Sequence, residues 1–141
     1  MRLAGHNVQS ARCAARWWAP VQGVFCTCVE GHLDMTAVQL LVDGFQATVD
    51  DAGTMLVSSF HDLQRVTSYD SEARVYYTEQ SKPVMVHVAS VEMLFSSRLI
   101  AMSIEVANIV LGSKLSGTTD CRFSRAWDRW FLTSFPPFAT G

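Results

Sequence analysis

The chain of 141 residues is long enough for one domain with a buried core, because 49% of its residues are hydrophobic and only 17% are charged. The net charge of -2 conceals an uneven distribution: residues 23–104 hold four bases against ten acids, whereas residues 1–22 hold three arginines and no acid. The middle of the chain therefore lacks the basic patch that dominates nucleic-acid binding, and any DNA contact there must be weak or local.

Residues 1–22 are predicted to form an irregular N-terminal extension. They carry arginines without acids and end in Trp17-Trp18-Ala19-Pro20. An alternative interpretation is a mitochondrial-type targeting segment, which is typically amphipathic, rich in arginine and poor in acids. Pro20 and Gly23 mark a break before the ordered part of the chain.

Short strands are predicted after this break. Residues 24–30 alternate in polarity and indicate a strand, and residues 35–42 indicate a second one, antiparallel to the first if the turn between them is short. Residues 43–48 are ambiguous between a helical turn and a loop. Residues 54–57 then predict a strand, because they follow the turn signal at residues 51–53.

A capped amphipathic helix is predicted to begin at Ser59 and to extend to about residue 69. Ser59 stands at the N-cap position and Asp62 follows three residues later, which is a capping-box arrangement. Phe60, Leu63 and Val66 share the apolar face of this helix. Its opposite face carries four polar side chains: His61, Gln64, Arg65 and Ser68.

Residues 74–78 and 83–88 predict a β-hairpin with a four-residue loop, and residues 93–104 predict a last strand. The expected fold class is therefore α+β, an antiparallel sheet with one helix on one face. The expected core consists of Leu40, Phe45, Leu63, Val66, Val75, Val86, Leu99 and Ala101.

Residues 105–141 form an aromatic-rich tail that follows the predicted domain at residues 23–104. Trp127, Trp130 and several phenylalanines lie beside basic residues in this segment. The composition is that of a docking peptide anchored by aromatic side chains, or of a poorly ordered tail whose aromatics partly cover an exposed sheet edge.

The sequence lacks the common catalytic, nucleotide and metal motifs. On a helix, the side chains of His61 and Asp62 would diverge by about 100° and could not form a relay. The four cysteines have neither zinc-site spacing nor the pattern of a disulfide framework. We therefore predict a protein that is not an enzyme and that needs no metal or cofactor. Without a signal peptide or a long apolar run, we also expect a reducing intracellular compartment and no membrane partner.

Residues 23–104 resemble part of the second clamp-like domain of the Rad-nine subunit family, from the nine-one-one DNA-damage checkpoint clamp. That clamp shares its ring architecture with proliferating cell nuclear antigen. The resemblance rests on the order of five segments: VFCTCVEGH, TAVQLLVDGF, TMLVSSFHDLQRV, SKPVMVHV and RLIAMSI. Ser81 stands where the family has a turn glycine, and His61 where it has a lysine. The chain covers about half of one clamp domain.

The resemblance implies a nuclear component or fragment of a sliding clamp that acts in DNA repair and checkpoint signalling. The implied partners are other checkpoint clamp subunits, the clamp loader and double-stranded DNA. In the assembled ring, His61, Gln64, Arg65 and Ser68 would face the duplex and contact phosphates without sequence specificity. An alternative is a free-standing α+β interaction module that self-associates by strand-edge pairing and has no DNA role.

Overall fold

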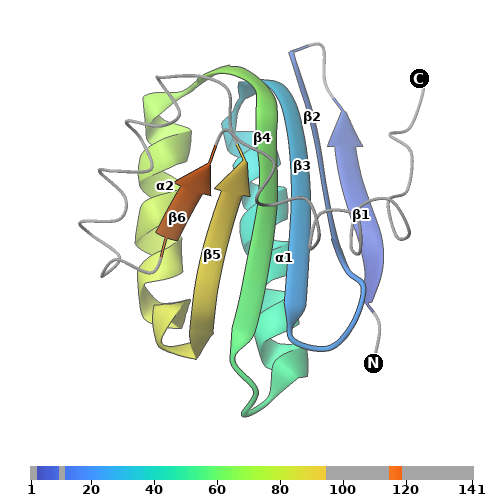
Figure 1. The fold of residues 1–141 in the computed structure, drawn as a ribbon. Coiled ribbons are helices and arrows are strands. Elements are labelled where there is room, and N and C mark those ends of the chain that lie inside the picture. Colours follow the sequence, from blue (N-terminus) through green and yellow to red (C-terminus); the bar gives the residue numbers. More distant parts are fainter. Residues whose placement is uncertain (1–2, 10–11, 95–114, 119–141) are drawn as a thin grey trace.

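The structure is a computed structural model that describes residues 3–9, 12–94 and 115–118. Within these residues, two α-helices cover one face of a six-stranded sheet (Figure 1). The elements in chain order are β1 (Leu3–Gln9), β2 (Cys13–Ala19), β3 (Val24–Leu33), α1 (Met35–Ala52), β4 (Val57–Tyr69), α2 (Ser71–Ser81), the short 3-10 helix η1 (Lys82–His87), β5 (Val88–Leu94) and β6 (Leu115–Thr118).

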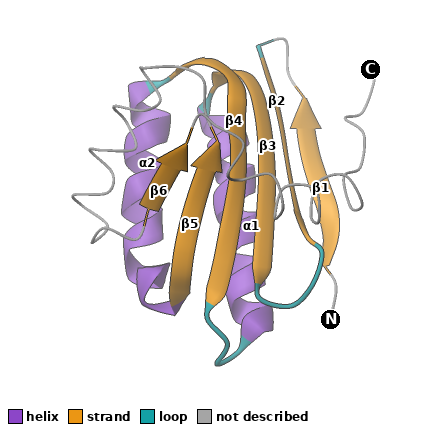
Figure 2. Ribbon diagram, in the orientation of Figure 1, coloured by secondary structure: helices purple, strands orange, loops and turns teal. Residues whose placement is uncertain are grey.

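The strands lie in the sheet in the same order as in the chain, from β1 to β6. β1, β2 and β3 pair antiparallel, whereas β3, β4, β5 and β6 pair parallel. The parallel connections from β3 to β4 and from β4 to β5 run through α1 and α2, and both helices lie behind the sheet in Figure 2. The opposite face of the sheet therefore carries neither of these helices.

α1 forms because apolar residues recur at helical spacing over its whole length. The side chain of Asp34 caps its first turn and accepts a hydrogen bond from the Ala37 amide at 2.9 Å. The helix ends at Gly53, whose φ of +63° favours glycine. The buried stripe consists of Ala37, Val38, Leu41, Gly44, Phe45, Thr48, Val49 and Ala52.

Phe25 on β3 is the centre of the core between sheet and helices, and it is completely buried. Its ring centroid lies 5.7 Å from that of Trp17 on β2 and 5.3 Å from that of Phe45 on α1. α1 approaches β2 so closely at Gly44 that a Cβ there would overlap the Trp17 indole. The absence of a side chain at Gly44 therefore allows the aromatic cluster to close.

The predictions of a strand at residues 35–42 and of a helix at residues 59–69 are wrong. The first segment lies in α1, because the apolar spacing continues to residue 52 with helical period. The second lies in β4, which pairs with β3 on one side and with β5 on the other. The hydrogen bonds of two ladders outweigh the local capping signal of Ser59 and Asp62.

The predicted hairpin and the predicted fold class are also wrong. Residues 74–78 belong to α2, and residues 83–88 form most of η1 and the start of β5. The sheet is mixed and is covered by two helices, so the fold is not an antiparallel sheet with one helix. Of the predicted last strand at residues 93–104, the part from residue 95 lies outside the described residues.

The segment predicted as an irregular extension, residues 1–22, contains two strands of the sheet. β2 pairs with β3 through six residue pairs from Cys13 to Trp18, and β1 pairs with β2. Trp17 and Trp18 are buried on opposite faces, because successive side chains of a strand point in opposite directions. The tail at residues 105–141 lies outside the described residues apart from residues 115–118.

The predicted core residues have different environments in the structure. Phe45 and Val66 are buried, and Leu40 and Leu63 are partly buried against the same cluster. Val75 and Val86 are not core residues, because their exposed fractions are 47% and 70%. They lie on the outer side of α2 and in η1, not in the predicted strands. Leu99 and Ala101 lie outside the described residues.

We expect Gly44→Ala to lower the free energy of unfolding by about 1–3 kcal/mol, because the new methyl group overlaps the Trp17 ring. Alanine is the better helix former, so propensity alone predicts the opposite sign. Urea denaturation measures the change, and Gly44→Ala should cost less stability in a Trp17→Leu background than in the wild type. Unchanged or higher stability in Gly44→Ala would show that α1 is not seated closely on β2.

Candidate functional site

His61 is a buried histidine on the side of the sheet that faces the helices, with only 4% of its surface exposed. Its Nδ1 atom lies 2.7 Å from the hydroxyl of Thr27, the residue opposite it in the β3–β4 ladder. Its ring also packs edge-on against Phe25, with centroids 5.9 Å apart. Burial lowers the pKa of His61 to about 4, so the imidazole is neutral near pH 7.

A cavity of about 20 Å³ lies beneath α2 next to His61. This volume corresponds to roughly one water molecule, so it is too small for an organic substrate. Burial raises the pKa of Tyr77, which lines the cavity, to about 12 and keeps the phenol protonated. The lining residues are Phe45, Ser59, His61, Tyr77, Ser81, Met85, Val91 and Met93.

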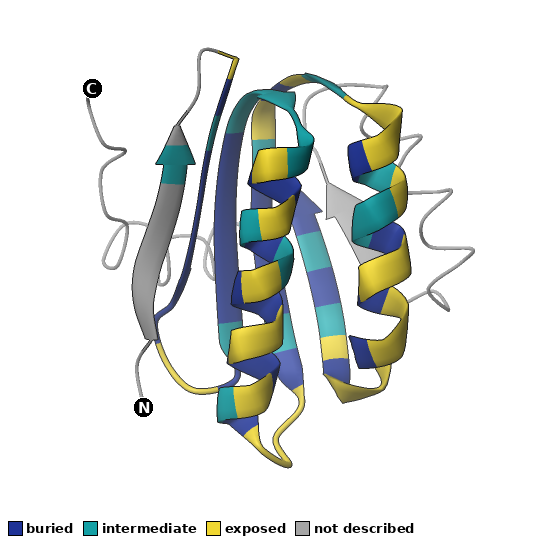
Figure 3. Cartoon of the chain, turned by 180° about the vertical axis from the view of Figure 1, so that it is seen from behind, coloured by how far each residue is buried: buried dark blue, intermediate teal, exposed yellow. Residues whose placement is uncertain are grey.

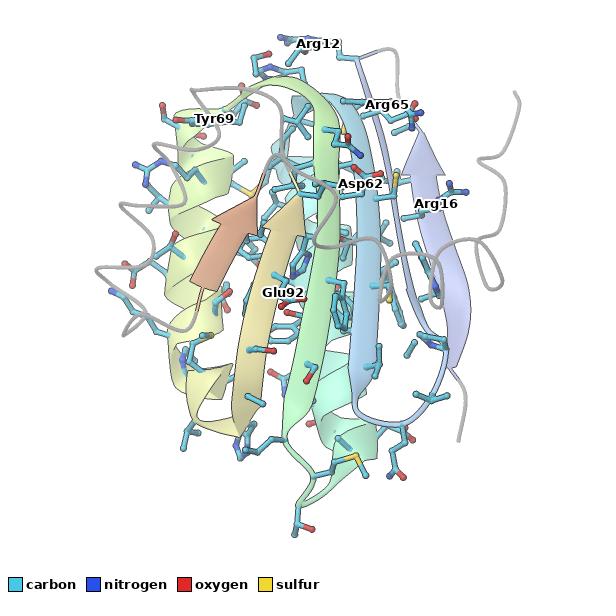
Figure 4. The ribbon with its side chains drawn as sticks, viewed as in Figure 1. Arg12, Arg16, Asp62, Arg65, Tyr69 and Glu92 are labelled. Atoms are coloured by element: carbon cyan, nitrogen blue, oxygen red, sulfur yellow. The ribbon has the colours of Figure 1, made fainter. Side chains whose placement is uncertain are left out.

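Asp62 and Arg16 are buried charged residues on the face of the sheet opposite α1 and α2, with exposed fractions of 4% and 1% (Figure 4). Asp62 Oδ1 accepts a hydrogen bond from the Gln64 amide at 3.1 Å, and its Oδ2 lies 3.7 Å from the thiol of Cys28. Burial, together with the nearby Asp62 charge, raises the pKa of Cys28 to about 12. Cys28 is therefore a protonated thiol and not a nucleophile at neutral pH.

His32, Ser68 and Asp70 form a polar cluster where β3 and β4 end and α2 begins. His32 Nδ1 lies 2.6 Å from the Ser68 hydroxyl, and His32 Nε2 lies 2.7 Å from Asp70 Oδ1. The order of contacts is that of a serine–histidine–aspartate chain. Here it ties two strand ends to the N-cap of α2, whose backbone amide also donates to the Leu33 carbonyl at 3.0 Å. The Asp70 carboxylate is thus bonded to His32 and does not cap α2.

The four residues predicted to face DNA do not form one surface, because the segment that carries them is a strand. His61 is buried towards the helices. Arg65 is exposed and forms an ion pair with Glu30 at 3.2 Å on the neighbouring strand. Gln64 donates to Asp62, and Ser68 contacts His32. The predicted helix caps are strand residues as well: Ser59 is fully buried, and Asp62 lies on the opposite face.

Four exposed apolar side chains gather at the end of the molecule where the parallel strands begin. Val21 lies three residues before β3, Met55 and Leu56 immediately precede β4, and Val86 lies two residues before β5. Their exposed fractions are 44%, 50%, 54% and 70%. The connections that carry them all lie at the lower end of the molecule in Figure 3, where exposed segments are yellow. We call these four residues the amino-end patch.

Backbone and side-chain contacts fix the loops of the amino-end patch. Gln22 Nε2 donates to the Asp51 carbonyl at 2.8 Å, which joins the β2–β3 loop to the end of α1. Met55 packs against Gly23, where a Cβ would overlap its sulfur. Val57 pairs with Val88, so β4 and β5 begin side by side. The patch is therefore a defined surface and not a set of unconnected loop residues.

This patch does not follow from the predicted elements, which place Met55 and Leu56 in a strand and Val86 in the core. The available signal is an apolar pair that begins two residues after the helix-ending Gly53. That signal becomes meaningful only when the strands are known to be parallel, because only then do the three connections converge at one end.

No protein-family model and no curated protein matches this chain. Solved structures similar to it in fold include the following two. The first is an uncharacterized protein of the DUF3478 family from Shewanella loihica PV-4, described as having a SpoIIAA-like fold. It has a TM-score of 0.59 and 12% sequence identity, and the match covers 90% of this chain and 94% of that chain. The second is the anti-sigma factor antagonist SpoIIAA in its unphosphorylated form, with a TM-score of 0.50, 15% identity and coverage of 89% and 95%.

These similarities identify a SpoIIAA-like fold: a small α+β domain with a mixed sheet and two helices. They contradict the resemblance to the Rad-nine subunit family and the expected half of a clamp domain. The checkpoint function depended on that resemblance and is wrong. The same holds for the nuclear localisation and for the expected partners: clamp subunits, clamp loader and encircled DNA.

We expect the folded chain to lose stability as the pH falls from about 6.5 to about 4. In this window the unfolded chain protonates His61 and the folded chain does not, so the contribution of His61 is complete above pH 6.5 and lost towards pH 4. The difference between the two pKa values corresponds to about 3 kcal/mol. Urea denaturation across this pH range should show a shallower pH dependence for His61→Gln than for the wild type.

His87→Gln is the matched control, because it removes an exposed histidine and leaves the buried imidazole at position 61 in place. Parallel curves for the wild type and His61→Gln would contradict a neutral, buried imidazole at position 61.

Proposed function

We propose that this chain is a non-enzymatic protein-interaction module that binds another protein through the amino-end patch. SpoIIAA, which has a similar fold, is by its name an antagonist of an anti-sigma factor and thus acts on a protein. A shared fold does not transfer a partner. The proposal therefore rests on the surface of this chain.

The observation that carries the proposal is the grouping of four exposed apolar side chains at one end of the sheet. Single exposed hydrophobic residues are common and need no explanation. A group of them with a polar rim is typical of a protein-binding surface. Because hydrogen bonds already hold the loops together, little conformational entropy would be lost when a partner binds.

Three reactive side chains among the described residues support recognition over chemistry, because they are engaged inside the domain. His61 is neutral and bonded to Thr27, and Cys28 is a protonated thiol next to Asp62. His32 is held between Ser68 and Asp70. Within the described part of the chain, no three potential metal ligands come together. No helix in that part has both the length and the apolar character needed to cross a membrane.

Self-association by strand-edge pairing is the second candidate function. The edge strands of the described sheet are β1 and β6. The register of β1 against β2 shifts between Leu3 and His6, and such irregularities discourage the addition of a further strand. β6 has only four residues, Leu115–Thr118. Both edges are therefore weaker candidates than the amino-end patch.

We expect a photo-crosslinking amino acid at position 56 to capture one discrete partner protein in the cells that express the chain. The same amino acid at position 75 should capture none, although Val75 is similarly exposed on α2. Mass spectrometry of the crosslinked product measures the outcome. A product with the mass of two copies of this chain, formed from position 5 in β1, would instead support edge pairing. Equal capture from positions 56 and 75 would contradict the proposal.

A further inference from the structure

We infer that the amino-end patch recognises a cationic amphipathic helix, a protein segment whose apolar side chains are flanked by lysine or arginine. This inference rests on the proposed function and adds the chemistry of the partner. It draws on three observations: the acidic end of α1, the charge balance of the rim, and the arrangement of the apolar side chains.

α1 ends at the patch with Asp50 and Asp51 in its last turn, and this turn contains no basic residue. The C-terminal end of a helix carries partial negative charge, so carboxylates there are in an unfavourable field. Asp50 is exposed and accepts a hydrogen bond from Gln46 at 3.0 Å. In the part of the chain that the structure describes, neither aspartate forms an ion pair. A cation from a partner would relieve this concentration of negative charge.

Among the described residues, the rest of the rim does not supply that cation. Lys82, at the start of η1, is already paired with Glu79 at 2.9 Å. The Asp, Glu, Lys and Arg side chains described around the patch are three acids and one lysine, because Asp50 and Asp51 add to the Glu79–Lys82 pair. The described part of the rim is thus acidic, and the partner that complements it is basic.

The connections that carry the apolar side chains suit a helix lying across them. Val21, the pair Met55 and Leu56, and Val86 precede three neighbouring parallel strands. Neighbouring strands lie about 4.8 Å apart, so the starts of the two outer strands, β3 and β5, lie about 10 Å apart. In an α-helix, residues i and i+7 share a face and lie about 10.5 Å apart along the axis. Apolar residues at i, i+3 or i+4, and i+7 of a partner helix can therefore contact the three positions.

Two other occupants fit the rim less well. A second copy of this chain, docked patch to patch, would bring two acidic rims together. An anionic membrane surface would be repelled by Asp50 and Asp51. Both occupants are outcomes of the experiment below.

The test uses the full chain and a fluorescent peptide of about 14 residues built from leucine and lysine, with leucines at helical spacing. Anisotropy titration should show saturable binding that weakens between about 50 and 500 mM salt.

Met55→Ser combined with Leu56→Ser should weaken binding at least about tenfold, and Asp50→Asn combined with Asp51→Asn should weaken it at low salt. Val75→Ser is the matched control and should bind like the wild type. All variants should remain folded with one cooperative melting transition, because none of the changed residues is buried in the core.

Separate results would overturn the inference and the proposed function. Equal binding of a leucine–glutamate peptide, or full binding by the Asp50→Asn, Asp51→Asn variant, would overturn the cationic partner and leave the patch as a protein-binding surface. A dimer in sedimentation that Leu56→Ser abolishes would make a second copy the occupant. Binding to anionic vesicles that requires Met55 and Leu56 would make a membrane surface the occupant of the patch. Unchanged peptide binding by Met55→Ser, Leu56→Ser, with no partner crosslinked from position 56, would overturn the proposed function itself.

Discussion

The fold depends on the aromatic contact that Phe25 makes between sheet and helix. Its ring meets Trp17, Phe45 and His61, which come from β2, α1 and β4. Aromatic pairs at these separations are attractive beyond the area they bury. The same packing buries His61 and keeps the imidazole neutral, so packing in the core determines the protonation state of this histidine.

Elements with a local signal can be predicted from the sequence. Residues 24–30 show the alternation of a half-buried strand and lie within β3. α1 was also predictable, because Val38, Leu41, Phe45 and Val49 repeat at helical spacing behind a capping aspartate. Residues 35–42 taken alone do not show this periodicity, because a short apolar run does not distinguish a strand from a helix.

Elements that depend on distant partners were not predictable. The capping-box pattern of Ser59 and Asp62 is worth about 1 kcal/mol, less than the two ladders that hold β4 between β3 and β5. α2 contains Val75, Tyr76 and Tyr77, which favour strands, yet it is the crossover that returns the chain to the parallel sheet. The amino-end patch and the cluster of His32, Ser68 and Asp70 join residues more than 30 positions apart, so only the strand order reveals them.

The agreement between the order of the strands in space and in the chain bears on how the protein is made. Each strand pairs with the strand translated before it, so the sheet can lengthen at one growing edge while the polypeptide leaves the ribosome. The β1–β3 meander pairs strands that are consecutive in the chain, so it can close before β4 is synthesised and serve as its template. No later strand of the described sheet must be inserted between two strands that are already paired. The sheet can thus assemble in the order in which its strands are synthesised. This order shortens the time during which the edge strand of the growing sheet is open to pairing with other chains.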